Sequence, residues 1–291
     1  MNKVEKISSL RAAVSAARKD KKTISFVPTM GNLHEGHLEL VRVAKRRADF
    51  VIVSIYVNPT QFGKNEDLEN YPSTPDDDAR LLAELGVDVL FLPNHETIYP
   101  GELSKQTVVY VPEISDMYCG KDRPEHFYGV TTVVSRLFNM VQPDVAVFGN
   151  KDYQQVAIIR RMVEDLAYPV QIVGVDTQRN EQGLALSSRN GYLTDKQTQT
   201  ARHLQATLQN MSESLRGSSS VKSKAALAEL EKSAKAKLKK LGFKPQYITV
   251  ARQSDLMPAK KGDQALVILA AASIGRARLI DNVEVQLGEG I

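Results

Sequence analysis

The sequence predicts an α/β protein: a Rossmann-type parallel sheet with helices on both faces, followed by a smaller C-terminal α+β domain. Short β-branched runs alternate with longer helical patterns through the first two-thirds of the 291 residues. Several of these runs are apolar almost throughout, as strands buried on both sheet faces are. After about residue 185 the order changes, and helices are followed by three strand-like runs. Strand–helix alternation predicts the parallel sheet, and the changed order predicts the second domain.

The elements of the first domain follow from these patterns. The expected strands span residues 23–29, 50–57, 88–93, 144–149 and 169–176. Helical patterns lie between them, at about 36–48, 76–86, 129–141 and 152–167. The last helix has an apolar stripe at helical spacing, made of Val156, Ile159, Met162, Val163 and Leu166. This alternation is typical of βαβ units.

In the second domain we expect a helix at about 195–215, a Gly-Ser-Ser-Ser stretch at 217–220 and a lysine-rich helix. Apolar residues of the lysine-rich helix recur at helical spacing, at Leu227, Leu230, Ala234, Leu238 and Leu241. Strand-like runs follow at 247–252, 265–273 and 277–285. We place the boundary between 176 and 190, with residues 1–183 as the Rossmann-type domain and 184–291 as the smaller domain.

Composition excludes several classes of protein. The hydrophobic fraction of 42% and charged fraction of 25% are typical of globular domains, which argues against intrinsic disorder. No apolar run approaches the roughly 18 residues that a membrane span needs, and the N-terminus has no signal-peptide pattern, so we expect a cytoplasmic protein with no membrane partner. The single cysteine, Cys119, excludes an intrachain disulfide and a thiol-rich metal site.

The formal net charge of +4 is distributed unevenly. Residues 1–185 carry 21 Lys and Arg against 25 Asp and Glu, and residues 186–291 carry 17 against 9. Much of the C-terminal excess lies on the lysine-rich helix, on faces away from its apolar stripe, as on a solvated helix. Because no aromatic stacking pattern or known motif accompanies it, we expect no nucleic-acid binding.

Residues 26–37, FVPTMGNLHEGH, run from the first expected strand directly into a helix. Ligands of open α/β sheets bind at the carboxyl ends of strands, and a helix start favours phosphate. Gly31 and Gly36 permit close backbone approach, and His34 and His37 are spaced to be neighbours. Two imidazoles there can donate to phosphate oxygens. The alternative is a tight turn with two surface histidines, but the glycines and the strand end favour the phosphate site.

A second strand end passes through glycine into a helix at residues 147–155, VFGNKDYQQ. Asp152 suits a helix N-cap, whereas the cation of Lys151 opposes the helix dipole there, which indicates an anionic ligand. A third segment, GLALSSRN at 183–190, has two hydroxyls before Arg189, which can grip phosphate in bidentate fashion. Its alternative is a linker turn capped by serines.

Two further segments carry polar groups. Asn58 and Gln61, in VNPTQF, are neutral donors and acceptors that suit a small substrate, although Asn-Pro is also an ordinary turn signal. The acidic run that ends at Asp78 most economically starts a helix. Asp78 is also our candidate for holding water around a magnesium ion, with Mg²⁺ bound mainly through nucleotide phosphates.

Five segments in order, PTMGNLHEGH, VNPTQF, RPEHFYGV, FGNKDYQQ and GLALSSRNGYL, resemble the pantoate–β-alanine ligase (pantothenate synthetase) family. The resemblance runs from about residue 24 to 194 and resumes near ARLIDN at 277–282. It implies ATP-dependent condensation of (R)-pantoate with β-alanine to pantothenate, AMP and pyrophosphate through a pantoyl adenylate, in coenzyme A biosynthesis. It also implies a fold related to the nucleotidyltransferases with a HIGH motif, and a homodimer.

The resemblance assigns the site residues position by position. His34 to His37 resemble the HIGH motif, with His37 as proton donor and His34 and Lys151 as further catalytic residues, and Leu186 to Arg189 resemble a mobile KMSKS-type loop. The residues expected to contact ATP are Met30, Gly31, Asn32, Leu33, His34, Glu35, Gly36, His37, Gly149, Asn150, Lys151, Asp152, Leu186, Ser187, Ser188 and Arg189. Gln61 and Gln155 match glutamines that hold pantoate, and we add Asn58 to this substrate site.

Two positions depart from the family pattern. Residue 150 is Asn where the family usually has Glu, and residue 180 is Asn where many members have Glu. For Asn150 we expect changed ATP affinity at most, because the neighbouring glycine, lysine and aspartate remain. Two other functions remain as alternatives: an adenylyltransferase of the same superfamily, and a nucleotide-binding regulatory protein without turnover.

Overall fold

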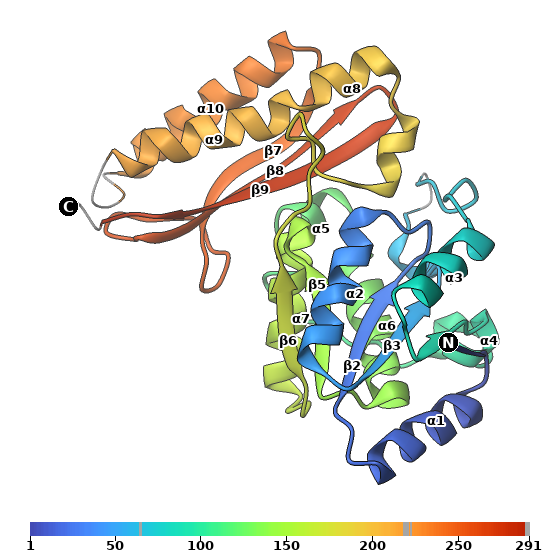
Figure 1. Cartoon of the computed structure of the whole chain (residues 1–291). Helices are drawn as coiled ribbons and strands as arrows, with labels where there is room; N and C mark the ends of the chain where they lie inside the picture. Colours follow the sequence, from blue (N-terminus) through green and yellow to red (C-terminus); the bar gives the residue numbers. More distant parts are fainter. Residues whose placement is uncertain (64–65, 218–220, 222, 289–291) are drawn as a thin grey trace. The chain divides into compact units, whose positions relative to one another are not determined.

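The protein forms two compact units in a computed structural model that describes residues 1–63, 66–217, 221 and 223–288 (Figure 1). Unit 1 contains Met1–Asn150 and Ile158–Asp176, and unit 2 contains Lys151–Ala157 and the chain from Thr177 onward. The chain passes from unit 1 into unit 2 for the last time after Asp176, inside the expected interval 176–190, and the domain boundary at 183/184 stays a prediction. The Gly-Ser-Ser-Ser stretch at 217–220 lies outside the described residues, except for Gly217.

Unit 1 is built on a six-stranded parallel sheet with the order β1-β4-β3-β2-β5-β6. Its strands are β1 (Asn2–Val4), β2 (Ile24–Thr29), β3 (Phe50–Ile55), β4 (Val89–Phe91), β5 (Val145–Gly149) and β6 (Gln171–Val175). The five predicted strands are confirmed with shortened ends, whereas β1 was not predicted. The chain proceeds from β2 to β3 and β4, then returns to β5 on the other side of β2. The strand order therefore reverses between β2 and β5, where an open α/β sheet binds ligands.

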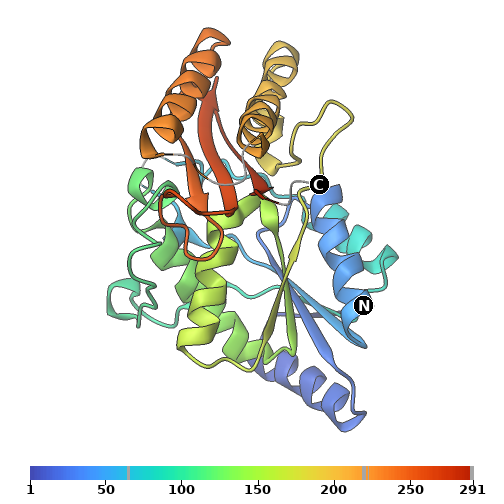
Figure 2. The same ribbon diagram turned by 90° about the vertical axis from the view of Figure 1, so that its left-hand side faces the viewer.

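The helical segments of unit 1 cover both faces of this sheet. They are α1 (Ile7–Lys19), α2 (Glu35–Arg47), α3 (Pro75–Glu84), α4 (His95–Ile98), α5 (Cys119–Asp122), α6 (His126–Val141) and α7 (Tyr153–Asp165), which begins in unit 2, with the 3₁₀ turns η1 (Pro59–Gln61), η2 (Leu103–Lys105) and η3 (Asn150–Asp152). Figure 2 shows the sheet nearly edge-on, with α2 and α3 (blue and cyan) on one side and α6 and α7 (green and yellow-green) on the other.

An apolar core lies between the sheet of unit 1 and the helices α2 and α3. Val27, Val53 and Leu90 of the sheet pack with Leu40 of α2 and Leu82 of α3. All four predicted helices are present: α2 and α3 bury their apolar stripes in this core, and α6 and α7 bury apolar residues of their own, such as Val134 and Ile159.

Two details of the helix prediction were incomplete. Leu166, assigned to the stripe of α7, is 51% exposed because the helix ends at Asp165. The helix α1 was not predicted; it buries only Leu10, Val14 and Ala17.

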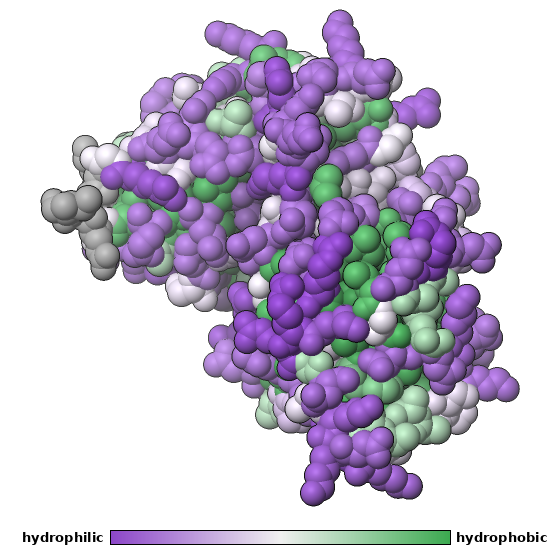
Figure 3. All heavy atoms as spheres, in the orientation of Figure 1, coloured by the Kyte–Doolittle hydropathy of each residue, from purple (hydrophilic) through white to green (hydrophobic). Residues whose placement is uncertain are grey.

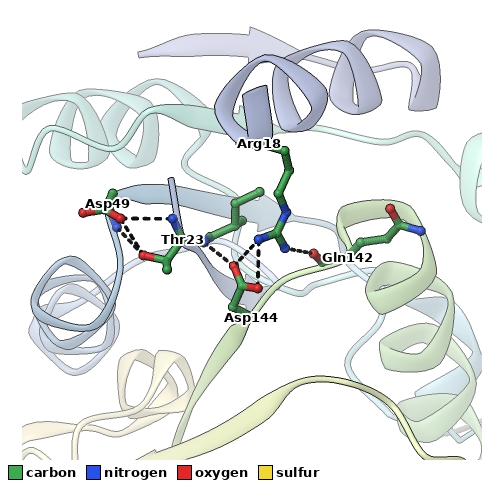
Figure 4. A network of polar contacts seen from close by, with 6 residues as sticks. Arg18, Thr23, Asp49, Gln142 and Asp144 are labelled. Carbon is green, nitrogen blue, oxygen red and sulfur yellow. Dashed lines mark hydrogen bonds and ion pairs between the residues drawn. The ribbon is translucent and has the colours of Figure 1, made fainter. Parts of the chain in front are cut away.

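A carboxylate anchors the amino end of β5 to β2 (Figure 4). Asp144, just before β5, accepts a hydrogen bond from the Ile24 amide at 2.7 Å and two from the Arg18 guanidinium at 2.8 and 2.6 Å. Arg18 also donates to the Gln142 carbonyl at 3.0 Å. A strand-end amide that would otherwise lack a partner is satisfied, and the C-terminus of α1 is tied to the sheet.

The same device recurs along this edge. Asp49, before β3, accepts from the Thr23 amide at 3.0 Å and from its hydroxyl at 2.7 Å (Figure 4), and these bonds hold the pKa of Asp49 below its usual range. Asp88, before β4, accepts from the Val51 amide at 2.8 Å. The aspartates that precede β3, β4 and β5 thus each accept a hydrogen bond from a backbone amide at the amino end of the adjacent strand.

Unit 2 consists of helices packed on a three-stranded antiparallel sheet with the order β7-β8-β9. Its elements are η4 (Ser188–Tyr192), α8 (Asp195–Ala201), α9 (His203–Arg216), α10 (Lys224–Lys240), β7 (Lys244–Arg252), β8 (Ala265–Ile274) and β9 (Ala277–Gln286). The single helix expected at 195–215 is two helices that divide at Arg202, a break that no proline or glycine marks in the sequence.

The apolar stripe of the lysine-rich helix is confirmed. Leu227, Ala234 and Leu238 are buried in the core of unit 2, and Leu230 and Leu241 pack against it. The helical side chains in the upper part of Figure 3 are mainly hydrophilic, as expected for solvated helix faces.

Candidate active site

The segment between β2 and α2 is held in a fixed shape by Asp78 of α3. Gly31 and Asn32 have positive φ values of 82° and 50°, so the chain turns sharply as it leaves β2. The carboxylate of Asp78 accepts from the amides of Asn32 and Leu33, both at 2.8 Å. A Cβ on Gly31 would lie 3.0 Å from the same carboxylate, in a conformation that disfavours other residues. Two amides of the proposed ATP loop are therefore committed to Asp78.

This placement argues against Asp78 as a magnesium ligand. Asp78 is only 1% exposed, and its carboxylate also accepts a hydrogen bond from the Thr74 hydroxyl at 3.0 Å. The expected helix start is confirmed, since α3 begins at Pro75. Among the described residues, no group of three or more His, Cys, Asp and Glu could hold a metal ion. Asp78 orders the loop instead of presenting free oxygens.

His34 and His37 form a reciprocal cap at the start of α2. Nδ1 of His34 accepts from the Gly36 amide at 3.1 Å, and Nδ1 of His37 accepts from the His34 amide at 3.3 Å. A ring nitrogen that accepts from a backbone N–H carries no proton, so a neutral imidazole in this position is protonated on Nε2. The ring centroids lie 4.1 Å apart. Both histidines are therefore arranged to donate from Nε2, away from the helix backbone.

Asn58 lies beneath Gln61 and determines how that side chain is oriented. Asn58 is 1% exposed; its Oδ1 accepts from the Thr60 amide at 3.4 Å, and its Nδ2 donates to the Gly129 carbonyl at 3.1 Å. Because a backbone amide only donates and a carbonyl only accepts, the orientation of the Asn58 amide is fixed. Its Nδ2 also lies 3.2 Å from Gln61, so the atom facing it is Oε1. Gln61 therefore turns its NH₂ group away from Asn58 and toward Met30 Sδ, which it contacts at 3.0 Å.

Tyr99 supports this arrangement from the core. Its hydroxyl donates to Asn58 Oδ1 at 3.1 Å, and burial raises the pKa of that hydroxyl, which keeps it a donor. Asn58, predicted as a substrate contact, is thus enclosed by protein groups. The sequence did not indicate Tyr99, which is 41 residues away.

The segment RPEHFYGV, residues 123–130, holds the backbone of the Gln61 turn. Arg123 donates to the Gln61 carbonyl at 3.2 Å, and His126 Nδ1 lies 2.7 Å from the same oxygen. A Cβ on Gly129 would approach the Thr60 carbonyl oxygen to 2.4 Å, so only glycine allows α6 to pack this closely. Sequence reasoning matched this segment to a family but gave it no role.

Arg123 also pairs with Glu66, through two bonds of 2.5 Å. Burial would raise the pKa of the Glu66 carboxyl, but the Arg123 hydrogen bonds outweigh this effect and lower it. The pair ties the segment that follows the Gln61 turn to the start of α6.

Gly149 and Asn150 lie at the carboxyl end of β5, next to β2 in the sheet. The Asn150 side chain packs on Gly174, where an added Cβ would lie 2.2 Å from its Oδ1. Asn150 Nδ2 lies 3.5 Å from the Asp176 carboxylate. A glutamate at residue 150 would bring a second carboxylate to Asp176, so the departure from the family pattern removes a repulsion.

In unit 2, Lys151, Asp152 and Gln155 form the turn η3 and the first turn of α7. The Lys151 side chain is 20% exposed, and its ammonium lies 3.6 Å from the Asp152 carboxylate. Gln155 is partly exposed, whereas the neighbouring Gln154 is buried. The cation at this helix start is thus partly balanced by an adjacent anion.

The Ser-Ser-Arg segment is a short closed loop. Asn190 Nδ2 donates to the Ala185 carbonyl at 2.9 Å, across the residues Leu186 to Arg189. Ser187 caps η4 by accepting from the Arg189 amide at 3.3 Å. Before the loop, Asn180 Oδ1 accepts from the amides of Gln182 and Leu184 at 3.1 and 2.9 Å. The second departure from the family pattern therefore serves as a turn acceptor.

Each unit thus brings together part of the predicted site. Unit 1 gathers the loop from Met30 to His37 with Gln61 and Asn58, and unit 2 contains Lys151 to Gln155 and the closed loop. Within the part of the chain that the structure describes, no helix has the length and apolar character to cross a membrane.

Comparison with known proteins gives one consistent result. A sequence profile described as Pantoate-beta-alanine ligase matches residues 2–284. The pantothenate synthetase of Colwellia psychrerythraea is 51% identical over 287 residues, which cover 99% of this chain and 100% of the relative. That of Pseudomonas putida is 52% identical over 290 residues, which cover 99% of each chain.

Two solved structures have the same fold. Pantothenate synthetase from Thermus thermophilus superposes with a TM-score of 0.89 at 42% identity, covering 98% of this chain and 100% of that chain. Pantoate-beta-alanine ligase from Francisella tularensis, described as complexed with beta-gamma ATP and beta-alanine, gives a TM-score of 0.77 at 36% identity and covers 97% of each chain.

Proposed function

Because this chain belongs to the pantoate–β-alanine ligase family, we propose that its two histidines at the strand-order reversal catalyse adenylation of pantoate. The protein is an AMP-forming ligase that uses ATP to condense (R)-pantoate with β-alanine, yielding pantothenate, AMP and pyrophosphate. The observation that carries the assignment of residues is that Nδ1 of His34 and Nδ1 of His37 each accept a backbone N–H, which leaves Nε2 as the donor nitrogen of each neutral ring. Both rings follow β2, beside the reversal of strand order where an open α/β sheet binds its ligand.

In the first step, a carboxylate oxygen of pantoate attacks the α-phosphorus of ATP. The bond from that phosphorus to the bridging oxygen breaks, and pyrophosphate leaves with the bonding electrons. Negative charge grows on the departing oxygens, and donors already in place stabilise it without reorganising. His37 and His34 supply such donors from Nε2, and Lys151 supplies a positive charge. We assign these three residues as catalytic.

The remaining assignments follow the family resemblance. ATP contacts Met30 to His37 and Gly149 to Asp152, and the closed loop from Leu186 to Arg189 adds two hydroxyls and a guanidinium for phosphate oxygens. The NH₂ group of Gln61 donates to an oxygen of pantoate, and Gln155 supplies a second amide. Asn58 acts on pantoate through Gln61, which it orients.

In the second step, the amine of β-alanine attacks the acyl carbon of the pantoyl adenylate. The bond from carbon to the phosphate oxygen breaks, AMP leaves, and the amine loses a proton. This chemistry needs positioning and charge stabilisation but no protein nucleophile. The donors assigned here provide both.

Magnesium enters with the nucleotide in this proposal. Asp78 is committed to backbone amides, and the described residues contain no cluster of three or more acidic, histidine or cysteine side chains that suits a metal. Mg²⁺ retains water readily and is often held by substrate phosphates. We therefore treat Mg–ATP as the substrate.

We also propose that the chain is a cytoplasmic homodimer. Its support is the family resemblance given by the five matched segments of the sequence. Light scattering after size exclusion tests the homodimer: a mass of twice the 32.2 kDa chain is expected, and a mass of 32.2 kDa would contradict it.

Pyrophosphate release with each substrate omitted in turn tests the function. We expect about one pyrophosphate per site with ATP and pantoate, and continued turnover when β-alanine is added. Pantoate labelled with heavy oxygen in its carboxylate should pass one label to AMP. A nucleotide-binding regulator would release no pyrophosphate, and another adenylyltransferase would not require pantoate. ADP with labelled inorganic phosphate would overturn the adenylate mechanism.

A further inference from the structure

The strand β9 contacts two of the proposed ATP-binding segments within unit 2. Asn282 Nδ2 donates to the backbone carbonyl of Lys151 at 3.0 Å. The preceding residue, Asp281, forms a two-bond ion pair with Arg179, at 2.7 and 2.8 Å. Both residues belong to ARLIDN, which sequence analysis matched to the family without a role. Nothing in the proposed mechanism uses them.

Asn282 contributes one of two anchors for the turn that carries Lys151. Residues 282 and 284 point to the same face of β9, because side chains alternate along a strand. Glu284, on that face, accepts from the Tyr153 hydroxyl at 2.8 Å. Residue 282 thus contacts residue 151, and residue 284 contacts residue 153, so the two contacts are two residues apart in both segments. Two points of attachment fix the direction of the turn as well as its position.

Asp281 acts on the opposite face of the strand. Its side chain is 3% exposed, and one oxygen also accepts from the Asn282 amide at 2.8 Å. Arg179 extends the contact by donating to the Gly183 carbonyl at 3.1 Å. Gly183 stands three residues before the Ser-Ser-Arg loop, and Arg179 bridges to Ala185, where that loop closes. Asp281 thereby anchors the base of the loop.

The burial of these groups makes the anchors strong. Removing one partner of a buried ion pair, or of a buried amide hydrogen bond, lowers the free energy of unfolding considerably, because the other partner is left without a hydrogen bond. The neighbours of both residues in β9, Leu279, Val283 and Val285, are buried in the core of unit 2. The strand is thus a rigid support, to which two chain segments far apart in sequence are attached through adjacent residues.

We propose that Asn282 and Asp281 are positioning residues for the adenylation step. Asn282 sets the location of Lys151, and Asp281 sets the base of the loop that carries Ser187, Ser188 and Arg189. Through them β9 fixes the spacing between the Lys151 cation and the phosphate-gripping loop. This inference rests on the proposed function, since it presumes that both segments bind ATP.

Double-mutant cycles test the proposal. We would measure binding of α,β-methylene-ATP by calorimetry, and kcat and KM from pyrophosphate release, in Asn282→Ala, Lys151→Ala and the double variant. A displacement of about 1 Å at a reacting centre lowers rates by roughly 100-fold, so Asn282→Ala should lower kcat by about 10- to 100-fold and weaken analogue binding. KM for pantoate should stay within about twofold of wild type. In the Lys151→Ala background, Asn282→Ala should cause little further loss.

The matched control is Gln286→Ala, which removes an exposed amide from the same strand and should leave every parameter unchanged. A second cycle pairs Asp281→Asn with Arg189→Ala, and the two losses should again be non-additive. If thermal melting shows that Asn282→Ala does not fold, Tyr153→Phe takes its place. It removes only the hydroxyl that contacts Glu284 and should weaken analogue binding several-fold.

Three results would overturn the proposal. The first is that Asn282→Ala keeps wild-type kcat and wild-type binding of α,β-methylene-ATP. The second is that Asn282→Ala lowers kcat by the same factor in the Lys151→Ala background as in wild type. The third applies if Asn282→Ala does not fold: it is that Tyr153→Phe binds α,β-methylene-ATP as tightly as wild type does. The proposed function fails separately: normal turnover by Lys151→Ala and Arg189→Ala would remove those residues from the mechanism, and this inference with them.

Discussion

Nδ1 of His37 accepts a hydrogen bond from the backbone amide of His34, at 3.3 Å, and the two rings lie with their centroids 4.1 Å apart. The histidine proposed to stabilise the leaving group is therefore oriented by the backbone of its neighbour. The same contact completes the cap of α2. One arrangement thus begins a helix and fixes which ring nitrogen carries the proton.

His37→Ala should lower the rate of pyrophosphate release by about 100- to 1,000-fold, the usual effect of losing one donor to a transition-state charge. His37→Gln keeps a donor of similar reach and should retain more activity. Rapid-quench measurement with ATP and pantoate alone isolates the step. Normal turnover by His37→Ala, with an unchanged melting temperature, would remove this histidine from the mechanism.

Gln61→Glu should impair the use of pantoate selectively. The substitution keeps an oxygen that accepts from Asn58 but replaces the NH₂ group with a carboxylate oxygen, which repels the substrate carboxylate. A lost hydrogen bond to a charged group is worth about 1.5–3 kcal/mol, so we expect kcat/KM for pantoate to fall at least tenfold. KM for ATP should change little. Gln209→Glu, on an exposed face of α9, is the matched control, and an equal rise in both KM values would contradict the assignment.

Asp78→Ala should raise KM for ATP and destabilise unit 1. The change leaves the amides of Asn32 and Leu33 without their acceptor, at a cost of about 1–3 kcal/mol for each buried group that stays unsatisfied. Denaturant titration measures the loss of stability, with Asp77→Ala, on the exposed side of α3, as control. The Mg²⁺ concentration for half-maximal activity at saturating ATP should not move. A large shift in that concentration would restore Asp78 as a metal ligand.

Acid should weaken the protein partly through Glu66. Its folded pKa is lowered because the Arg123 hydrogen bonds outweigh burial, so the folded state binds this proton less readily than the unfolded state. The stability that the pair contributes is fully present above the ordinary value of 4.5 and is lost as the pH falls through the lower, folded pKa. Glu66→Gln should therefore be less stable than wild type at pH 7, and the difference should shrink toward pH 3. Urea denaturation at each pH measures it; a constant difference would contradict the linkage.

The sequence predicted the sheet because its strands are buried on both faces and read as apolar runs. It missed β1 and α1, because a three-residue edge strand and a helix with three buried side chains leave weak patterns. The segments proposed to bind ATP were predicted from glycines and polar residues at strand ends, and their contact with ATP stays a prediction. Their supports were not found, because Asp78 and Tyr99 act over 46 and 41 residues and nothing local in the chain marks such a partnership.

The carboxylates of Asp49, Asp88 and Asp144 mark the edge of the sheet opposite the proposed chemistry, and they bear on how the chain avoids wrong pairings. A parallel strand that slips by two residues keeps the same side chains on the same faces, so apolar burial discriminates poorly against it. The slip would carry each aspartate past the single amide that it now caps, and leave that amide without a partner. Burial of apolar side chains thus stabilises the sheet but does not distinguish the native register from a shifted one. These three polar contacts favour the native register. They thereby also keep the opposite ends of the strands, which carry the proposed site, in register with one another.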